Sequence, residues 1–194
     1  MAALATLRKR RCRPLICGLV AATLLLAPSW FAVAEERPIS EYQLKAVFLF
    51  NFTQFVDWPA DTFSSADQPV VIGVLGDDPF GSYLDETVRG ERVNNRSLLI
   101  RRYHSDKELG ECQVLFISQS EAGRLDDILQ RLNNRSVLTV SDSPGFGQRG
   151  GMVLFVMEDH HVRLRINADA AKAAHLTISS KLLRAADIVT TGRH

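Results

Sequence analysis

The stretch 41-EYQLKAVFLFNFTQFVDWP-59 decides how the rest of the chain must fold. It holds six of the fifteen aromatic residues in nineteen positions. Ser40 or Glu41 can cap the start of a helix, and Pro59 predicts that this helix ends by Trp58. Residues 46–50 are apolar on every side of the helix, and Lys45 stands at their margin. Such a helix must be covered on most of its circumference, by its own domain or by a partner.

The aromatic helix therefore has two interpretations. In the first, it is a core helix, and each fully buried phenylalanine stabilises the fold by roughly 1.5–3 kcal/mol. In the second, Phe52, Phe55 and Trp58 also form the apolar centre of a contact with another protein.

The first 34 residues have the pattern of a secretory signal peptide. An apolar segment, residues 15–27, precedes the small-residue sequence Ala-Val-Ala at 32–34. The basic residues ahead of it are Arg8, Lys9, Arg10, Arg11 and Arg13. We therefore expect residues 1–34 to be removed after Ala34 and residues 35–194 to form one domain in the periplasm.

Removal of this leader changes the charge of the protein. Five of the 23 basic residues leave with it, so 18 basic residues remain against 22 acidic ones, a formal charge of −4. An acidic chain of this kind does not indicate a nucleic-acid partner.

Cys12 and Cys17 also leave with the leader, so Cys112 remains alone. Its place before an apolar strand favours a buried thiol, and an intermolecular disulfide or a reactive thiol stays open.

The order of apolar segments predicts an α/β fold. Strands are expected at residues 70–75, 97–103, 114–118 and 136–140, with helices at residues 80–88 and 121–133 between them. Residues 152–157 and 162–166 flank Glu158, Asp159, His160 and His161 as an antiparallel hairpin. The expected architecture is a single domain with a mixed, largely parallel sheet, a C-terminal antiparallel hairpin and helices on both faces.

The last strand of this hairpin offers a candidate binding surface. Val162, Leu164 and Ile166 alternate with polar residues, so one face of the strand is expected to be buried and the other to face solvent or a partner. A final helix over residues 181–187 adds further basic groups. Arginine is frequent at interface hot spots. The predicted partner-binding residues are Arg163, Arg165, Asn167, Lys181, Arg184, Phe52, Phe55 and Trp58, although an ordinary solvated face remains an alternative.

No motif assembles a catalytic centre. Residues 145–150 match G-x-G-x-x-G, but a strand pattern follows where dinucleotide binding needs a helix, so these glycines indicate a tight connection. His160 and His161 would point to opposite faces of a strand and so seldom share a metal ion. We therefore expect no enzyme, cofactor or metal. A small-ligand site at residues 76–80 and 118–121, where two parallel strands end, is the alternative function.

Taken in order, seven stretches resemble the YfiR family of bacterial periplasmic proteins. They are EYQLKAVFLFNFTQFVDWP, VIGVLGDDPFG, CQVLFIS, LTVSD, FGQRGGMVLFV, VRLRIN and LTISSKLLRAADIV, and together they span residues 40–189. The resemblance implies a compact α/β domain without catalytic activity.

The resemblance also implies a regulatory function. A protein of the YfiR type binds the periplasmic sensor domain of an inner-membrane diguanylate cyclase of the YfiN type and holds it inactive, which lowers cyclic-di-GMP and biofilm formation. An outer-membrane lipoprotein of the YfiB type can draw it away. Well-known members also link their redox response to disulfides, whereas Cys112 has no partner cysteine in the exported chain. Whether two copies pair as a homodimer is left open.

Overall fold

Helix α1 (Glu41–Phe55) begins at a capping box and ends where the chain enters a two-stranded sheet. The Ser40 side chain accepts a hydrogen bond from the Gln43 N–H, and the Gln43 side chain accepts one from the Ser40 N–H. The helix stops at Phe55 rather than at Trp58, because β1 (Val56–Asp57) pairs antiparallel with β9 (Thr177–Ile178). The computed structural model describes residues 40–189, so the predicted leader and the C-terminal tail lie outside the described residues.

The main sheet has eight strands in the order β10-β8-β7-β6-β5-β2-β4-β3. Five of them run parallel to one another, and β3, β8 and β10 run opposite to these five. The strands are β2 (Val70–Leu75), β3 (Arg92–Val93), β4 (Arg96–Tyr103), β5 (Val114–Ile117), β6 (Leu138–Ser141), β7 (Val153–Glu158), β8 (His161–Asn167) and β10 (Asp187–Val189). The expectation of a mixed, largely parallel sheet with a C-terminal hairpin is confirmed.

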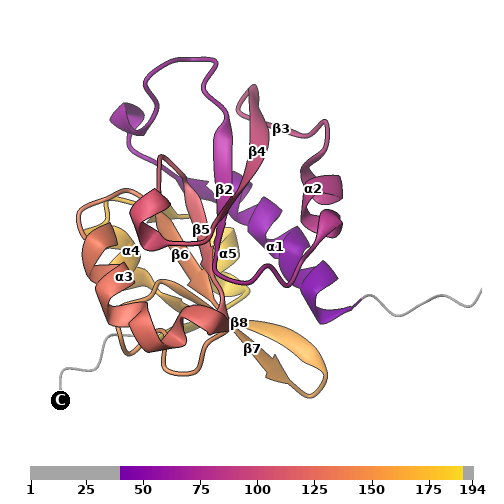
Figure 1. Cartoon of the computed structure of the whole chain (residues 1–194), viewed down its shortest axis with the longest axis vertical. Coiled ribbons are helices and arrows are strands. Elements are labelled where there is room, and N and C mark those ends of the chain that lie inside the picture. The colour runs from indigo at the N-terminus through magenta and orange to yellow at the C-terminus, as the bar shows by residue number, and fades with distance from the viewer. Residues whose placement is uncertain (1–39, 190–194) are drawn as a thin grey trace, which may run out of the picture. The chain divides into compact units, whose positions relative to one another are not determined.

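Helices cover both faces of this sheet, as expected (Figure 1). Ile72 and Val74 of β2 join α1 and α2 (Ser82–Val88) in one apolar cluster, which α4 (Ala168–Ala173) and α5 (Ser180–Arg184) also enter. Val71 and Leu75 point the other way and pack against α3 (Leu125–Leu132). Residues 40–189 also contain three short 3₁₀ turns: Ala60–Thr62, Asp106–Glu108 and Gln119–Arg124. Among residues 40–189, none of the helices has the length and hydropathy that a membrane span requires.

Several boundaries differ from the sequence expectations for reasons of tertiary pairing. Helix α3 begins at Leu125 rather than at Glu121, because residues 119–124 form a 3₁₀ turn. Helix α5 ends at Arg184 instead of residue 187, because Asp187 starts β10 beside β8. The two-residue strands β1, β3 and β9 have too few residues to show an alternating pattern.

The β7–β8 hairpin extends beyond its neighbours at the lower right of Figure 1. Asp159 and His160 form its two-residue turn with φ angles of 49° and 62°, the left-handed values that a tight hairpin requires. On one side β6 pairs with β7 at Val153 and Leu154 only, and on the other β10 pairs with β8 at residues 165–167 only. The half of the hairpin nearer its turn is therefore a two-stranded ribbon with open edges within the described chain.

Candidate functional site

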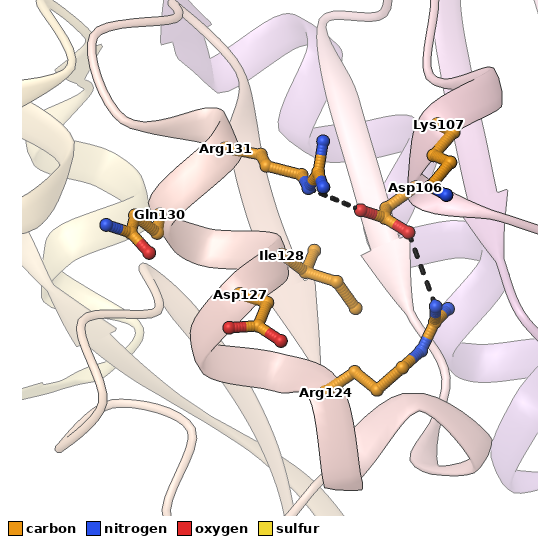
Figure 2. Close-up of a pocket in the computed structure, with 7 residues that line it drawn as sticks. All are labelled: Asp106, Lys107, Arg124, Asp127, Ile128, Gln130 and Arg131. Carbon is orange, nitrogen blue, oxygen red and sulfur yellow. Dashed lines mark hydrogen bonds and ion pairs between the residues drawn. The ribbon is translucent and has the colours of Figure 1, made fainter.

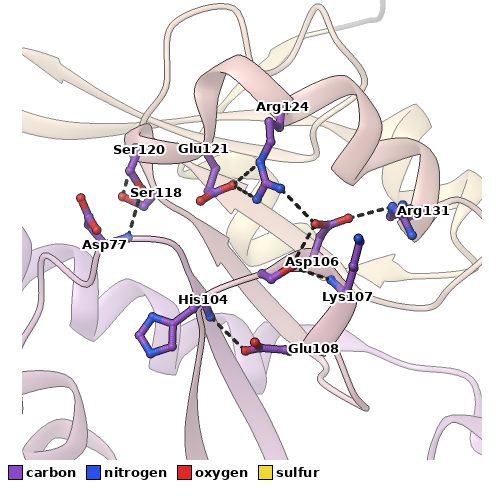
Figure 3. Close-up of polar contacts among 11 residues, drawn as sticks. Asp77, His104, Asp106, Lys107, Glu108, Ser118, Ser120, Glu121, Arg124 and Arg131 are labelled. Carbon is purple, nitrogen blue, oxygen red and sulfur yellow. Dashed lines mark hydrogen bonds and ion pairs between the residues drawn. The ribbon is translucent and has the colours of Figure 1, made fainter.

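The two loops expected to hold a small ligand contact each other directly. They follow β2 and β5, which are neighbours in the sheet. The Asp77 N–H donates a hydrogen bond to the Ser120 Oγ at 3.0 Å, as Figure 3 shows. Gly76 has a φ of 88°, and a β-carbon there would lie 2.4 Å from the same oxygen. This close approach requires glycine, and it ties the two loops together.

A cavity of about 470 Å³ beside α3 is lined mainly by charged residues (Figure 2). Asp106 is its most buried carboxylate, with 7% of its side chain exposed, and it lies 2.7 Å from the Arg131 Nε. Arg124 lies 3.4 Å from the other Asp106 oxygen and also binds Glu121 at 2.6 Å. Figure 3 shows these ion pairs joining the turn at Asp106 to Arg124, just before α3, and to Arg131 in the last turn of α3. The arrangement neutralises the carboxylate and fixes this loop.

A second charged cluster lies at the start of α1, and it is buried. The Lys45 Nζ lies 2.6 Å from the Asp142 Oδ2 and 2.5 Å from the Glu41 Oε1. The exposed side-chain fraction is 2% for Lys45 and 4% for Asp142. Tyr42 donates a hydrogen bond to the same Asp142 oxygen at 3.0 Å. The Asp142 Oδ1 is buried and has no hydrogen-bond partner among the described residues.

This cluster also raises the pKa of Tyr42 to about 12. Burial of the phenol is the main cause, and the negative charge of Asp142 and its hydrogen bond to the hydroxyl add to it. The Lys45 ammonium lies 4.4 Å from the centre of the Tyr42 ring. Sequence reasoning placed Lys45 at the margin of the apolar helix and missed the cluster. The available signal was a lysine one turn after Glu41 in an otherwise apolar segment.

A cavity of about 410 Å³ runs from this cluster along β7. Its walls come from α1, from the loop between β6 and β7, and from the hairpin. The lining residues are Glu41, Lys45, Gln119, Asp142, Pro144, Gly145, Gln148, Leu154, Phe155, Val156, Met157 and Arg165. Of the predicted partner-binding residues, Arg165 is the one that lines it, and Gln119 of the predicted ligand loop 118–121 lines it as well.

The residues of the predicted polar face of β8 differ in their exposure to solvent. Arg163 is exposed, and Arg165 is half-exposed and pairs with Glu158 at 2.7 Å. Asn167 is fully buried, which corrects the expectation that it shares the outward face. Its side chain caps α4 by accepting a hydrogen bond from the Ala170 N–H. The strand ends there and turns into a helix, so alternation no longer decides burial.

The predicted aromatic contact is also divided. Phe52 is fully buried and lies 6.0 Å from Phe155, ring centre to ring centre, so it belongs to the core and not to a surface. Phe55 and Trp58 are partly buried and pack against the same cluster. The Phe55 carbonyl accepts a hydrogen bond from the Ser179 N–H at 2.8 Å. Phe55 therefore lies next to the start of α5, on which Lys181 is exposed.

Arg184, at the end of α5, is exposed as well. It stands three residues before β10, whose Asp187 is paired in register with Arg165. Arg163 and Arg165 therefore lie on the sheet, whereas Lys181 and Arg184 lie on helix α5. The pairing of β10 with β8 connects the two elements.

Cys112 is buried, as expected, with 3% of its surface exposed. Burial raises the pKa of its thiol to about 11, which makes it a poor nucleophile at neutral pH. The glycine-rich segment 145–150 lies within the connection between the parallel strands β6 and β7, which runs over residues 142–152 and is longer than the tight connection expected. Within residues 40–189, no three His, Cys, Asp or Glu side chains are arranged to hold a metal ion.

A comparison with protein families identifies the family of this chain. A family model described as YfiR/HmsC-like matches residues 42–187, which is nearly the whole of the described domain. None of the curated proteins compared with the chain matches it. The chain therefore belongs to the YfiR/HmsC-like family, a non-catalytic family of regulators in cyclic-di-GMP signalling.

Proposed function

We propose that this protein is a periplasmic regulator that binds the sensor domain of an inner-membrane diguanylate cyclase and holds the enzyme inactive. Cyclic-di-GMP and biofilm formation then rise when the regulator is released. The observation that carries this proposal is the family match over residues 42–187. The leader predicted at residues 1–34 supports export with cleavage after Ala34. An outer-membrane lipoprotein of the YfiB type is a second partner under the same proposal.

The exposed basic groups near the hairpin are the proposed contact surface. Arg163 extends from β8 into solvent, and Arg165 lies two residues further on the same face. An arginine can pair with a partner carboxylate through two parallel hydrogen bonds. Phe55 and Trp58 are the proposed apolar part of the contact, and Lys181 and Arg184 add charge on α5.

Charge reversal at Arg163 tests the proposal. Arg163→Glu should leave the melting temperature nearly unchanged, because Arg163 is exposed and surface substitutions change stability little. In cells that carry the cognate cyclase, we expect it to raise cyclic-di-GMP, because the regulator no longer docks. Arg165→Gln is the second variant, since a glutamate there would also repel Glu158.

Arg89→Glu is the matched control, because Arg89 is exposed at the end of α2 and belongs to no proposed contact. If both hairpin variants repress the cyclase as well as the parent does, the contact surface lies elsewhere. If cyclic-di-GMP is unchanged on deletion of the whole protein, the proposed function is wrong.

A further inference from the structure

The hairpin leaves one backbone edge open next to a cavity. β6 pairs with β7 at Val140–Val153 and Ser141–Leu154, and β6 ends at Ser141. Beyond Leu154, β8 is the strand neighbour of β7 within residues 40–189. We call the side of residues 155–157 that faces away from β8 the β7 edge.

The register of the hairpin shows which backbone groups point to this edge. Hydrogen-bonded and non-bonded pairs alternate along an antiparallel ladder. The Asn167 N–H donates to the Met152 carbonyl directly opposite, at 2.8 Å, so this is a bonded pair. Met157 and Val162, five residues along, form a non-bonded pair. The N–H of Met157 therefore points to the β7 edge, and that of Val162 points to the opposite edge of the ribbon.

The cavity of about 410 Å³ lies along the β7 edge, and three parts of the chain line it. They are Glu41 and Lys45 of α1, the loop at residues 144–148, and Leu154 to Met157 of β7. An extended peptide needs open space beside a strand edge, because its backbone pairs with that edge while its side chains point to the two sides.

The charges in this cavity favour a basic occupant. Two carboxylates, Glu41 and Asp142, share the single ammonium of Lys45, which leaves an excess of one negative charge there. The Asp142 Oδ1 has no donor in the described chain. Arg165 also lines the cavity, and its charge is already neutralised by Glu158. A lysine, an arginine or another donor on the occupant is the complement of the two carboxylates.

We propose that the β7 edge accepts an extended, basic segment of the cyclase sensor domain as an added β-strand. The inference rests on the proposed function, since it specifies how that partner docks. It differs from a contact through the arginine side chains alone, because here the backbone of the regulator supplies part of the affinity. The added strand would also cover the exposed side chain of Met157, which has 44% of its surface in solvent.

Two proline substitutions on the same non-bonded pair test the inference. Met157→Pro deletes the N–H that points to the β7 edge, and Val162→Pro deletes the N–H on the opposite edge. Neither N–H belongs to the β7–β8 ladder, so the hairpin is expected to survive both changes. Binding of the purified sensor domain is measured by calorimetry. We expect Met157→Pro to weaken it by about tenfold or more and Val162→Pro to leave it within about twofold of the parent.

Amide hydrogen exchange in the parent complex is the second measurement, and it needs no variant. The Met157 amide should become protected on binding, while the Val162 amide should not. Equal affinity of the two proline variants, together with an unprotected Met157 amide, would overturn the added strand and leave the proposed function intact. Failure of the parent to bind the sensor domain at all would overturn the proposed function and the inference together.

Discussion

Removal of the Lys45 charge should strongly destabilise the protein, because its partner Asp142 would stay buried. Lys45→Met keeps a long side chain of similar size and deletes only the ammonium. Breaking a buried ion pair from one side costs about 3–5 kcal/mol, since the remaining charge is uncompensated. Asp142 has 4% of its side chain exposed and would retain the Tyr42 hydroxyl as its one side-chain donor. We therefore expect a loss near the middle of this range.

Glu41 gives the matched control. It binds the same ammonium at 2.5 Å, but 38% of its side chain is exposed. Glu41→Gln should therefore cost less than about 1 kcal/mol, as exposed ion pairs do. The free energy of unfolding is measured by urea titration at pH 7, with circular dichroism as the signal.

The double variant Lys45→Met with Asp142→Leu separates charge from packing. If the cost of the single variant comes from the stranded carboxylate, removing that carboxylate should recover most of the lost stability. A loss below about 1 kcal/mol for Lys45→Met would contradict the claim that this pair is electrostatically coupled in the core.

Two further predictions concern other buried groups. Cys112 should resist alkylation at pH 8 in the folded protein and react rapidly in denaturant. Its folded pKa of about 11 lies above the ordinary 9.0. The stability that the buried thiol contributes is therefore present below pH 9 and is lost as the pH rises to 11. That loss should be absent in Cys112→Ala, and rapid alkylation of the native protein would contradict the buried thiol. Gly151→Ala places a β-carbon 2.2 Å from the buried Phe146 ring and should cost about 1–3 kcal/mol, whereas Gly110→Ala, with its nearest neighbour at 3.6 Å, should change stability by less than about 0.5 kcal/mol. Equal unfolding free energies for the two alanine variants would show that the Phe146 ring can move aside.

Local patterns predicted the sheet well. The continuous apolar run 70–75 is β2 with all six residues buried, and Leu125, Ile128 and Leu132 pack α3 against the sheet as their spacing indicates. The hairpin follows from two apolar runs around the polar residues 158–161, of which Asp159 and His160 form the turn. These features depend on periods of two and 3.6 residues, which the sequence contains directly.

Features that depend on distant pairing were not predictable in the same way. Strand β10 exists because it lies beside β8, and the burial of Asn167 follows from its role as the cap of α4. Lys45 can be buried because Asp142, 97 residues later, forms an ion pair with it and accepts its hydrogen bond. The open β7 edge is likewise invisible in the sequence, since it results from β6 ending at Ser141. Each of these requires the strand order, which apolar periodicity does not specify.

A reconstituted enzyme tests most directly whether this chain binds and represses a diguanylate cyclase. The cognate cyclase is placed in lipid vesicles with its sensor domain outward and GTP enclosed, and cyclic-di-GMP synthesis is followed as the purified residues 35–194 are added. We predict that synthesis falls in a saturable manner and that Arg163→Glu requires a higher concentration than Arg89→Glu to reach half-inhibition. Synthesis that is unchanged at saturating protein, with the sensor domain shown to be folded, would contradict the account.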